Sequence, residues 1–195
     1  LGMDFNYDKR NQKFQTTSGF FSNYSIDIPI LSDTNTLTNT YNYKIFKELY
    51  DENVSTISFL LKSSNSITGD NVKLSERLYI PARKLRGFEA GKVGPKDGSD
   101  YVGGNYISTI NATSTIPKIL ENVQNVDVVM FADVGKIWGV DYNSSLETDE
   151  IRSSVGLGID WLTAIGPLTF SFAHPITQAE SDITETFRFN LGTSF

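Results

Sequence analysis

The stretch IRSSVGLGIDWLTAIGPLTFSFA, residues 151–173, decides the fold of this chain. Large apolar side chains stand at alternate positions in both of its halves. In the first half Ile151, Val155, Leu157, Ile159 and Trp161 alternate with Arg152, Ser154, Gly156, Gly158 and Asp160, and in the second half Leu168, Phe170 and Phe172 alternate with Thr169, Ser171 and Ala173. This period of two is typical of a β-strand with one apolar face. The short run LTAIGP between the halves predicts a tight turn, and therefore a hairpin.

The same alternation recurs along most of the chain, where helical spacing fits poorly. It predicts strands within residues 1–8, 20–30, 37–45, 55–63, 103–113, 126–135, 151–161, 166–173 and 187–195. We therefore expect an all-β protein of nine antiparallel strands.

Two features favour a transmembrane β-barrel over a soluble β-sandwich, which also alternates. The polar faces of the last four strands are small or carry glycine, as a crowded or wet lumen allows. The connections differ in size, because residues 162–167 form a tight turn whereas residues 136–150 form a long polar loop. Short turns on one side and long loops on the other are typical of outer-membrane barrels.

Composition excludes several classes of function. The chain has 23 acidic and 17 basic residues, for a net charge of −6, which disfavours a nucleic-acid partner. It has no cysteine, so disulfides and thiolate metal sites are excluded. No apolar run reaches the roughly 18 residues of a membrane-spanning helix. We expect no cofactor and no metal, and the start at Leu1 suggests a fragment.

Catalysis has weak support in the sequence. A serine hydrolase would have to use His174, the one histidine, with a serine such as Ser171 and an acid such as Asp182. No nucleophile elbow surrounds any serine, so we expect no enzyme and no catalytic residue. The acidic residues Glu180, Asp182 and Glu185 lack the ordered spacing of a calcium loop, and we expect a solvated turn there.

The longest stretch without alternation, residues 72–100, contains the tripeptide Arg86-Gly87-Phe88. Loops of this length are usually functional or disordered. One interpretation is an exposed turn. The other is that the loop folds back into a barrel lumen, where the planar guanidinium of Arg86 pairs with an inward carboxylate such as Asp133 or Asp160.

The same hypothesis gives roles to the two residues that follow Arg86. Gly87 would let the main chain approach the barrel wall closely, because it has no Cβ. Phe88 would pack against an inward aromatic side chain such as Phe131.

Several motifs together resemble the BamA-like outer-membrane protein assembly factors of the bacterial surface antigen family. They are Arg86-Gly87-Phe88, GKVGPKDG (91–98), YVGGN (101–105), MFADVGKIW (130–138), IRSSVGLGIDWLTAIGPLTFSFAHPI (151–176) and FRFNLGTSF (187–195). They occur in family order and cover most of residues 77–195.

The resemblance implies a fold and a set of site residues. The family fold is a sixteen-stranded barrel preceded by POTRA domains, so residues 1–195 would be the C-terminal part of the barrel, without POTRA domains. Arg86, Gly87 and Phe88 would anchor the loop, with Asp133 and Phe131 as lumenal partners. Thr113 stands where the family often has a glutamate, the second partner of the arginine. The closing strand would include Phe187, Phe189, Leu191, Gly192 and Phe195.

The resemblance also implies a function without covalent chemistry. The chain would belong to an insertase that assists folding and insertion of β-barrel clients through a lateral seam, in the outer membrane of a Gram-negative bacterium. Its partners would be outer-membrane lipids, client barrels and accessory lipoproteins. The alternatives are a protein-secretion transporter of the same superfamily and a passive porin.

Overall fold

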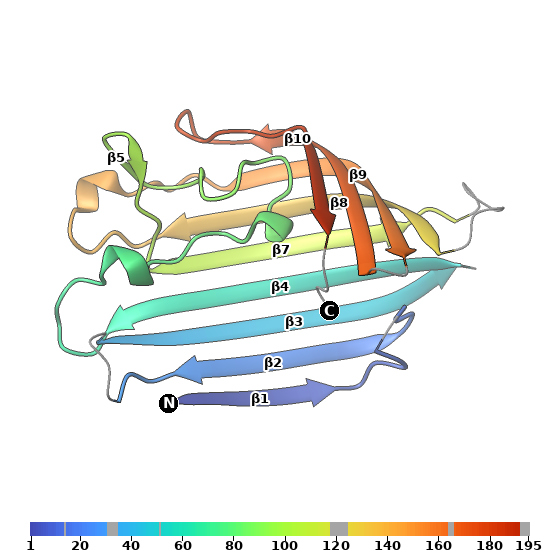
Figure 1. Cartoon of the computed structure of the whole chain (residues 1–195), viewed down its shortest axis with the longest axis horizontal. Helices are drawn as coiled ribbons and strands as arrows, with labels where there is room; N and C mark the ends of the chain where they lie inside the picture. The colour runs from blue at the N-terminus through green and yellow to red at the C-terminus, as the bar shows by residue number, and fades with distance from the viewer. Residues whose placement is uncertain (14, 31–34, 51, 118–124, 164–165, 192–195) are drawn as a thin grey trace.

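The chain forms one antiparallel sheet in which each strand pairs with the next strand of the sheet. The computed structural model describes residues 1–13, 15–30, 35–50, 52–117, 125–163 and 166–191. The sheet has nine strands in the order β1-β2-β3-β4-β7-β8-β9-β10-β11, as Figure 1 shows. Their bounds are β1 Gly2–Asp8, β2 Gly19–Asp27, β3 Thr36–Tyr50, β4 Asn53–Ser66, β7 Tyr106–Thr115, β8 Val126–Trp138, β9 Arg152–Thr163, β10 Gly166–Thr177 and β11 Phe187–Leu191. The prediction of nine antiparallel strands is confirmed.

The two faces of the sheet differ in polarity, because the alternation in the sequence separates them. On the outer face, large apolar side chains remain about half exposed, among them Ile57, Met130, Leu157 and Phe172 at 54%, 50%, 54% and 53%. On the inner face, the register places Ser58, Asn111, Asp133 and Ser154 side by side, and all four are buried. A sheet that buries polar groups and exposes apolar ones suits a lipid surrounding.

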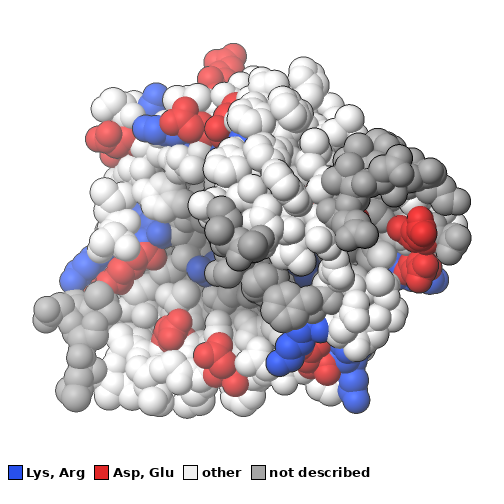
Figure 2. Space-filling model, turned by 45° about the vertical axis from the view of Figure 1, so that its right-hand side comes forward, with Lys and Arg blue, Asp and Glu red and all other residues white. Residues whose placement is uncertain are grey.

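The sheet is strongly curved. Strands β9 to β11 bend over the broad layer formed by β1 to β4, β7 and β8, and the segment between β4 and β7 lies inside the curve (Figure 1). The space-filling view in Figure 2 shows a hollow on this side, with charged side chains gathered mainly toward the borders and white surface between them. No helix in the described residues is long and apolar enough to cross a membrane.

The hydrophobic core lies between the sheet and this inner segment. Its buried members are Leu60, Leu78, Ile80, Leu85, Phe88, Val93, Ile107 and Ile137, which come from β4, β7, β8 and the segment. A β-sandwich would place its core between two sheets. Here a folded-in loop takes the place of the second sheet, so the sandwich alternative does not describe this chain.

Short elements shape the connections. The segment between β4 and β7 contains the 3-10 turns η1 (Leu74–Glu76) and η2 (Ala82–Lys84) and a small hairpin of β5 (Lys96–Asp97) and β6 (Asp100–Tyr101). A third turn, η3 (Ser144–Leu146), lies between β8 and β9. The residues 72–100 are called the inner segment below.

Candidate functional site

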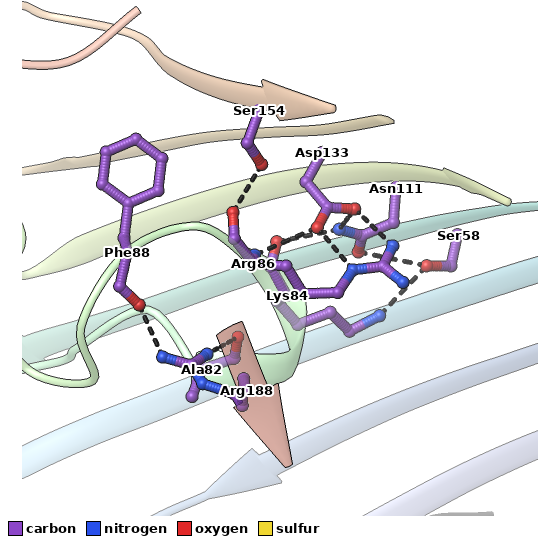
Figure 3. A network of polar contacts seen from close by, with 9 residues as sticks. All are labelled: Ser58, Ala82, Lys84, Arg86, Phe88, Asn111, Asp133, Ser154 and Arg188. Atoms are coloured by element: carbon purple, nitrogen blue, oxygen red, sulfur yellow. Dashed lines mark hydrogen bonds and ion pairs between the residues drawn. The ribbon is translucent and has the colours of Figure 1, made fainter. Parts of the chain in front are cut away.

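Arg86 lies in the middle of the inner segment and points at β8 (Figure 3). Its Nε donates to Asp133 Oδ2 at 2.8 Å and its Nη2 donates to Asp133 Oδ1 at 2.8 Å. The main-chain N–H of Arg86 adds a third bond to Oδ2 at 3.0 Å. Because Asp133 is fully buried, this two-pronged ion pair compensates a charge that burial alone would strongly disfavour. Among the two expected carboxylates, Asp133 is the partner of Arg86.

Phe131 supports the same guanidinium from one side. The Arg86 Cζ lies 3.4 Å from the centroid of the Phe131 ring, a cation–π contact. Phe131 and Asp133 are two residues apart on β8, so both face inward. Space for the ring exists because its neighbour on β9 is Gly156, where a Cβ would lie 2.4 Å from Phe131 Cζ.

The expectation that Phe88 packs against Phe131 is wrong. Phe88 is 1% exposed and belongs to the core cluster with Leu85, Ile107 and Ile137, of which Phe131 is not a member. The guanidinium of Arg86 lies against the Phe131 ring instead. Phe88 therefore helps bury the inner segment at a different place on the sheet.

Asn111 rather than Thr113 is the strand-β7 residue that supports Asp133. Its Nδ2 donates to Asp133 Oδ1 at 2.9 Å and to the Lys84 carbonyl at 2.8 Å. Its Oδ1 accepts from Ser58 Oγ at 3.2 Å, and Lys84 Nζ donates to the same hydroxyl at 3.1 Å. Asn111 lies two residues before Thr113, so both side chains are on the same face of β7. A neutral amide here leaves Asp133 to Arg86 alone as its ionic partner among the described residues.

Gly87 brings the main chain against β9 and β10. Its φ is +91°, and a Cβ there would lie 3.2 Å from both Ala173 Cβ and Ser154 Cβ. A non-glycine residue would be strained by its backbone and crowded by the wall at once. Ser154 Oγ donates to the carbonyl of Arg86, which fastens the tripeptide to β9.

A second ion pair, Arg152–Asp182, was not predicted. Arg152 Nε on β9 donates to Asp182 Oδ2 at 2.9 Å, and both side chains are completely buried. Asp182 also accepts from the main-chain N–H of Gly94 at 3.1 Å and of Ala179 at 2.7 Å. The expectation of a solvated acidic turn is thus wrong for Asp182. The available signal was Arg152 itself, an arginine at an inward position of a strand.

The closing strand β11 presents opposite faces to the two sides of the sheet. Phe187, Phe189 and Leu191 lie on the outer face, where Phe172 pairs with Phe187 at 4.9 Å and Phe170 with Phe189 at 5.1 Å between ring centroids. Gly192 and Phe195, which the sequence also assigns to this strand, lie outside the described residues.

The candidate hydrolase residues do not form a triad. Ser171 is buried on the inner face of β10, whereas His174 is exposed on the outer face of the same strand. Asp182 is committed to Arg152. The three groups therefore cannot pass a proton between one another.

Comparisons with known proteins point to one family. The family model described as the Omp85 superfamily domain matches residues 1–195. The outer membrane protein assembly factor BamA of Neisseria meningitidis serogroup B is 31% identical over 139 residues, which are 57% of this chain and 17% of that protein. The sorting assembly machinery 50 kDa subunit of Saccharomyces cerevisiae is 27% identical over 215 residues, covering 100% of this chain and 43% of that protein.

A solved structure gives the same fold. The crystal structure of BamA from Haemophilus ducreyi lacking POTRA domains 1–3 superposes with a TM-score of 0.86 at 26% identity, covering 96% of this chain and 41% of that one. The nine-stranded sheet is therefore part of a barrel of this kind. The chain spans less than half the length of each of these relatives.

Proposed function

Because this chain belongs to the Omp85 superfamily, we propose that it is part of an outer-membrane protein insertase, which assists the folding and insertion of β-barrel proteins through a lateral seam. The observation that carries the proposal is the last strand of the sheet. In the described part of the chain, β11 has a strand neighbour, β10, on one side only, and pairs with it over five residue positions from Leu168 to Phe172.

A free strand edge is a template for another strand. Its unpaired N–H and C=O groups bind an incoming extended segment with little demand on sequence, because the bonds come from the main chain. The outer face of β10 and β11 is apolar, so a client strand added there would meet lipid on one side. The folding of the client drives the reaction, and the insertase lowers the barrier without covalent chemistry.

The same proposal assigns the surroundings of the protein. Outer-membrane lipids contact the apolar outer face, client β-barrel proteins contact the seam, and accessory lipoproteins complete the assembly complex. The proposed location is the outer membrane of a Gram-negative bacterium. The relatives include proteins from both bacteria and yeast, which supports an outer-membrane setting of either origin.

The loop-anchoring roles belong to this proposal as well. Arg86, Gly87 and Phe88 fix the inner segment to the wall, with Asp133 and Phe131 as the inward partners of Arg86, and keep the interior beside the seam filled. A passive porin would need an open path here instead. Conductance of the reconstituted chain, with and without Arg86→Ala, tests that alternative: a large steady conductance in the unsubstituted chain would favour the porin.

A disulfide experiment tests the seam directly. The chain has no cysteine, so single substitutions give unique crosslinking positions. We expect Phe189→Cys on β11 to crosslink to a cysteine in the last strand of an unfolded client barrel added to proteoliposomes. The matched control is Ile57→Cys on the outer face of β4, which has strands on both sides and exposes its side chain similarly. Equal crosslinking at the two positions would contradict a seam at β11.

A further inference from the structure

The connection between β10 and β11, residues 178–186, is bonded to the inner segment through its main chain. The N–H of Glu89 donates to the Ile183 carbonyl at 2.8 Å, and the N–H of Ile183 donates to the Lys92 carbonyl at 3.0 Å. The N–H of Glu185 donates to the Gly87 carbonyl at 3.0 Å. Residues 178–186 are called the closing connection below. They pair with the inner segment through main-chain hydrogen bonds, as a neighbouring strand would.

Asp182 fixes the start of the closing connection. Its carboxylate binds Gly94 of the inner segment, Ala179 of its own turn and Arg152 of the barrel wall. One buried side chain therefore joins three parts of the chain. None of these bonds involves the Arg86–Asp133 pair, so they form a separate attachment.

Arg188 fixes the other end, on β11 itself. Its Nη1 donates to the carbonyl of Ala82, its Nη2 donates to the carbonyl of Phe88, and Nε donates to Glu185 Oε2 at 3.0 Å. The residue is 9% exposed. Figure 3 shows its guanidinium reaching the inner segment from the last strand.

The guanidinium couples two movements because it carries a positive charge and donates to both β11's own connection and the inner segment. If β11 moved away from the inner segment, Arg188 would lose its acceptors and a cation would remain unpaired in a poorly solvated interior. The alternative is that residues 82–88 move with the strand. Either outcome makes the release of β11 depend on how firmly the inner segment is held.

We propose that Arg188 is a positioning residue that ties the last strand to the inner segment, so that opening of the β11 edge and undocking of the inner segment are thermodynamically coupled. Arg188 and Asp133 thus act on the same equilibrium from two strands. The consequence for client access rests on the proposed function, whereas the coupling itself is a property of this chain alone.

Hydrogen exchange of the chain in phospholipid bilayers, without any client, tests the coupling. We expect Arg188→Gln to speed exchange of amides in both residues 187–191 and residues 82–92 by about tenfold, since bonds to a charged group are lost. Asp133→Asn, which weakens the other attachment, should speed exchange in the same two peptides because coupling is reciprocal. Glu185→Gln should speed exchange in the same two peptides by a smaller factor. It replaces Arg188→Gln in this test if that variant does not fold.

The double variant Arg188→Gln/Asp133→Asn separates coupling from two independent structural losses. Coupled attachments predict a combined effect clearly different from the product of the single effects. Arg10→Gln is the matched control, since it removes an arginine that lies between β1 and β2 and pairs with Asp8, at the opposite end of the strand order from β11. Faster exchange in residues 187–191 without a change in residues 82–92, or multiplicative effects in the double variant, would overturn the proposal. Because no client is present, a failed insertion assay would not affect this result.

Discussion

The two ends of the sheet share one sequence pattern but differ in what their inner faces touch. At β1 to β3, one inward row holds the neutral amides Asn6, Asn23 and Asn42, and all seven residues of β1 are exposed. At β8 to β11, inward Asp133, Arg152 and Arg188 are buried in ion pairs with other parts of the chain.

The difference shows that pairing between strands does not by itself bury the inward side chains. Asn23 Nδ2 donates to Asn6 Oδ1 at 2.8 Å, a bond that works equally well in contact with water. Among the described residues, the buried arginines Arg86, Arg152 and Arg188 form their ion pairs where the inner segment covers the sheet and excludes water. Covered wall and uncovered wall should therefore respond differently to the same kind of substitution.

The largest effect should follow loss of the fully buried pair. We expect Asp182→Ala to lower the free energy of unfolding by about 3–5 kcal/mol, because it leaves Arg152 buried without a partner. Urea unfolding in lipid measures the change. The control is Asn23→Ala on the uncovered wall, where we expect a loss of about 1 kcal/mol or less. Similar losses at the two sites would break the comparison.

Loss of the central pair should be somewhat milder, because the buried Asp133 keeps hydrogen bonds from the main-chain N–H of residue 86 and from Asn111 Nδ2. We expect Arg86→Ala to lower the free energy of unfolding by about 1.5–3 kcal/mol. It should also make the inner segment and β11 sensitive to protease, while β1 to β3 stay protected. Simultaneous loss of protection in β1 to β3 would show that the segment and the whole sheet form one unit.

Gly87→Ala should have a smaller effect. The left-handed backbone alone disfavours alanine by about 1–2 kcal/mol. Gly91→Ala is the control, since Gly91 also has a positive φ, of 71°, but no neighbouring atom within 4 Å of an added Cβ. Unfolding free energies should show a larger loss at Gly87 than at Gly91. Equal losses would mean that the close approach to β9 and β10 is unimportant.

The stability of the fold should depend on pH through Asp141, which accepts a hydrogen bond from the N–H of Val72 at the start of the inner segment. Burial alone would raise the pKa of Asp141, but hydrogen bonds from the Val72 N–H and Asn105 and the charge of Arg77 lower the pKa below its ordinary value. The carboxylate thus contributes stability that is present above its ordinary pKa and lost as the pH falls through the lowered one. Urea midpoints between about pH 5 and pH 3 should therefore fall less steeply in Asp141→Asn than in the unsubstituted chain. Identical slopes would contradict this.

The smallest effect should be at Arg10, on the uncovered side. Arg10 Nη2 lies 2.8 Å from Asp8, and the pair lies at the surface, where solvent screens such attractions. Arg10→Gln should leave the urea midpoint unchanged within error. A clear shift would mean that the uncovered half depends on charge after all.

The sequence could predict the strands because period-two alternation is a local signal. It could also suggest the partner of Arg86, since an inward aspartate and an arginine-glycine pair have matching chemistry. It could not predict the position of Asn111, because no local signal fixes strand register to within two residues. Asp182 was missed for a related reason, since a carboxylate in a loop has the same local sequence whether it meets solvent or a buried arginine.

The attachment of the inner segment also sets the order in which the molecule can form. Arg188 donates to Ala82 and Phe88 across 106 and 100 residues of chain, and Arg86 reaches Asp133 across 47. The segment is made before β8, β9 and β11, so its attachments to these three strands must wait until they have arrived. Contacts so distant in the chain make folding slow. The interior is thus completed only when β11 is in place, so docking of the inner segment reports that the chain has been made at least as far as β11.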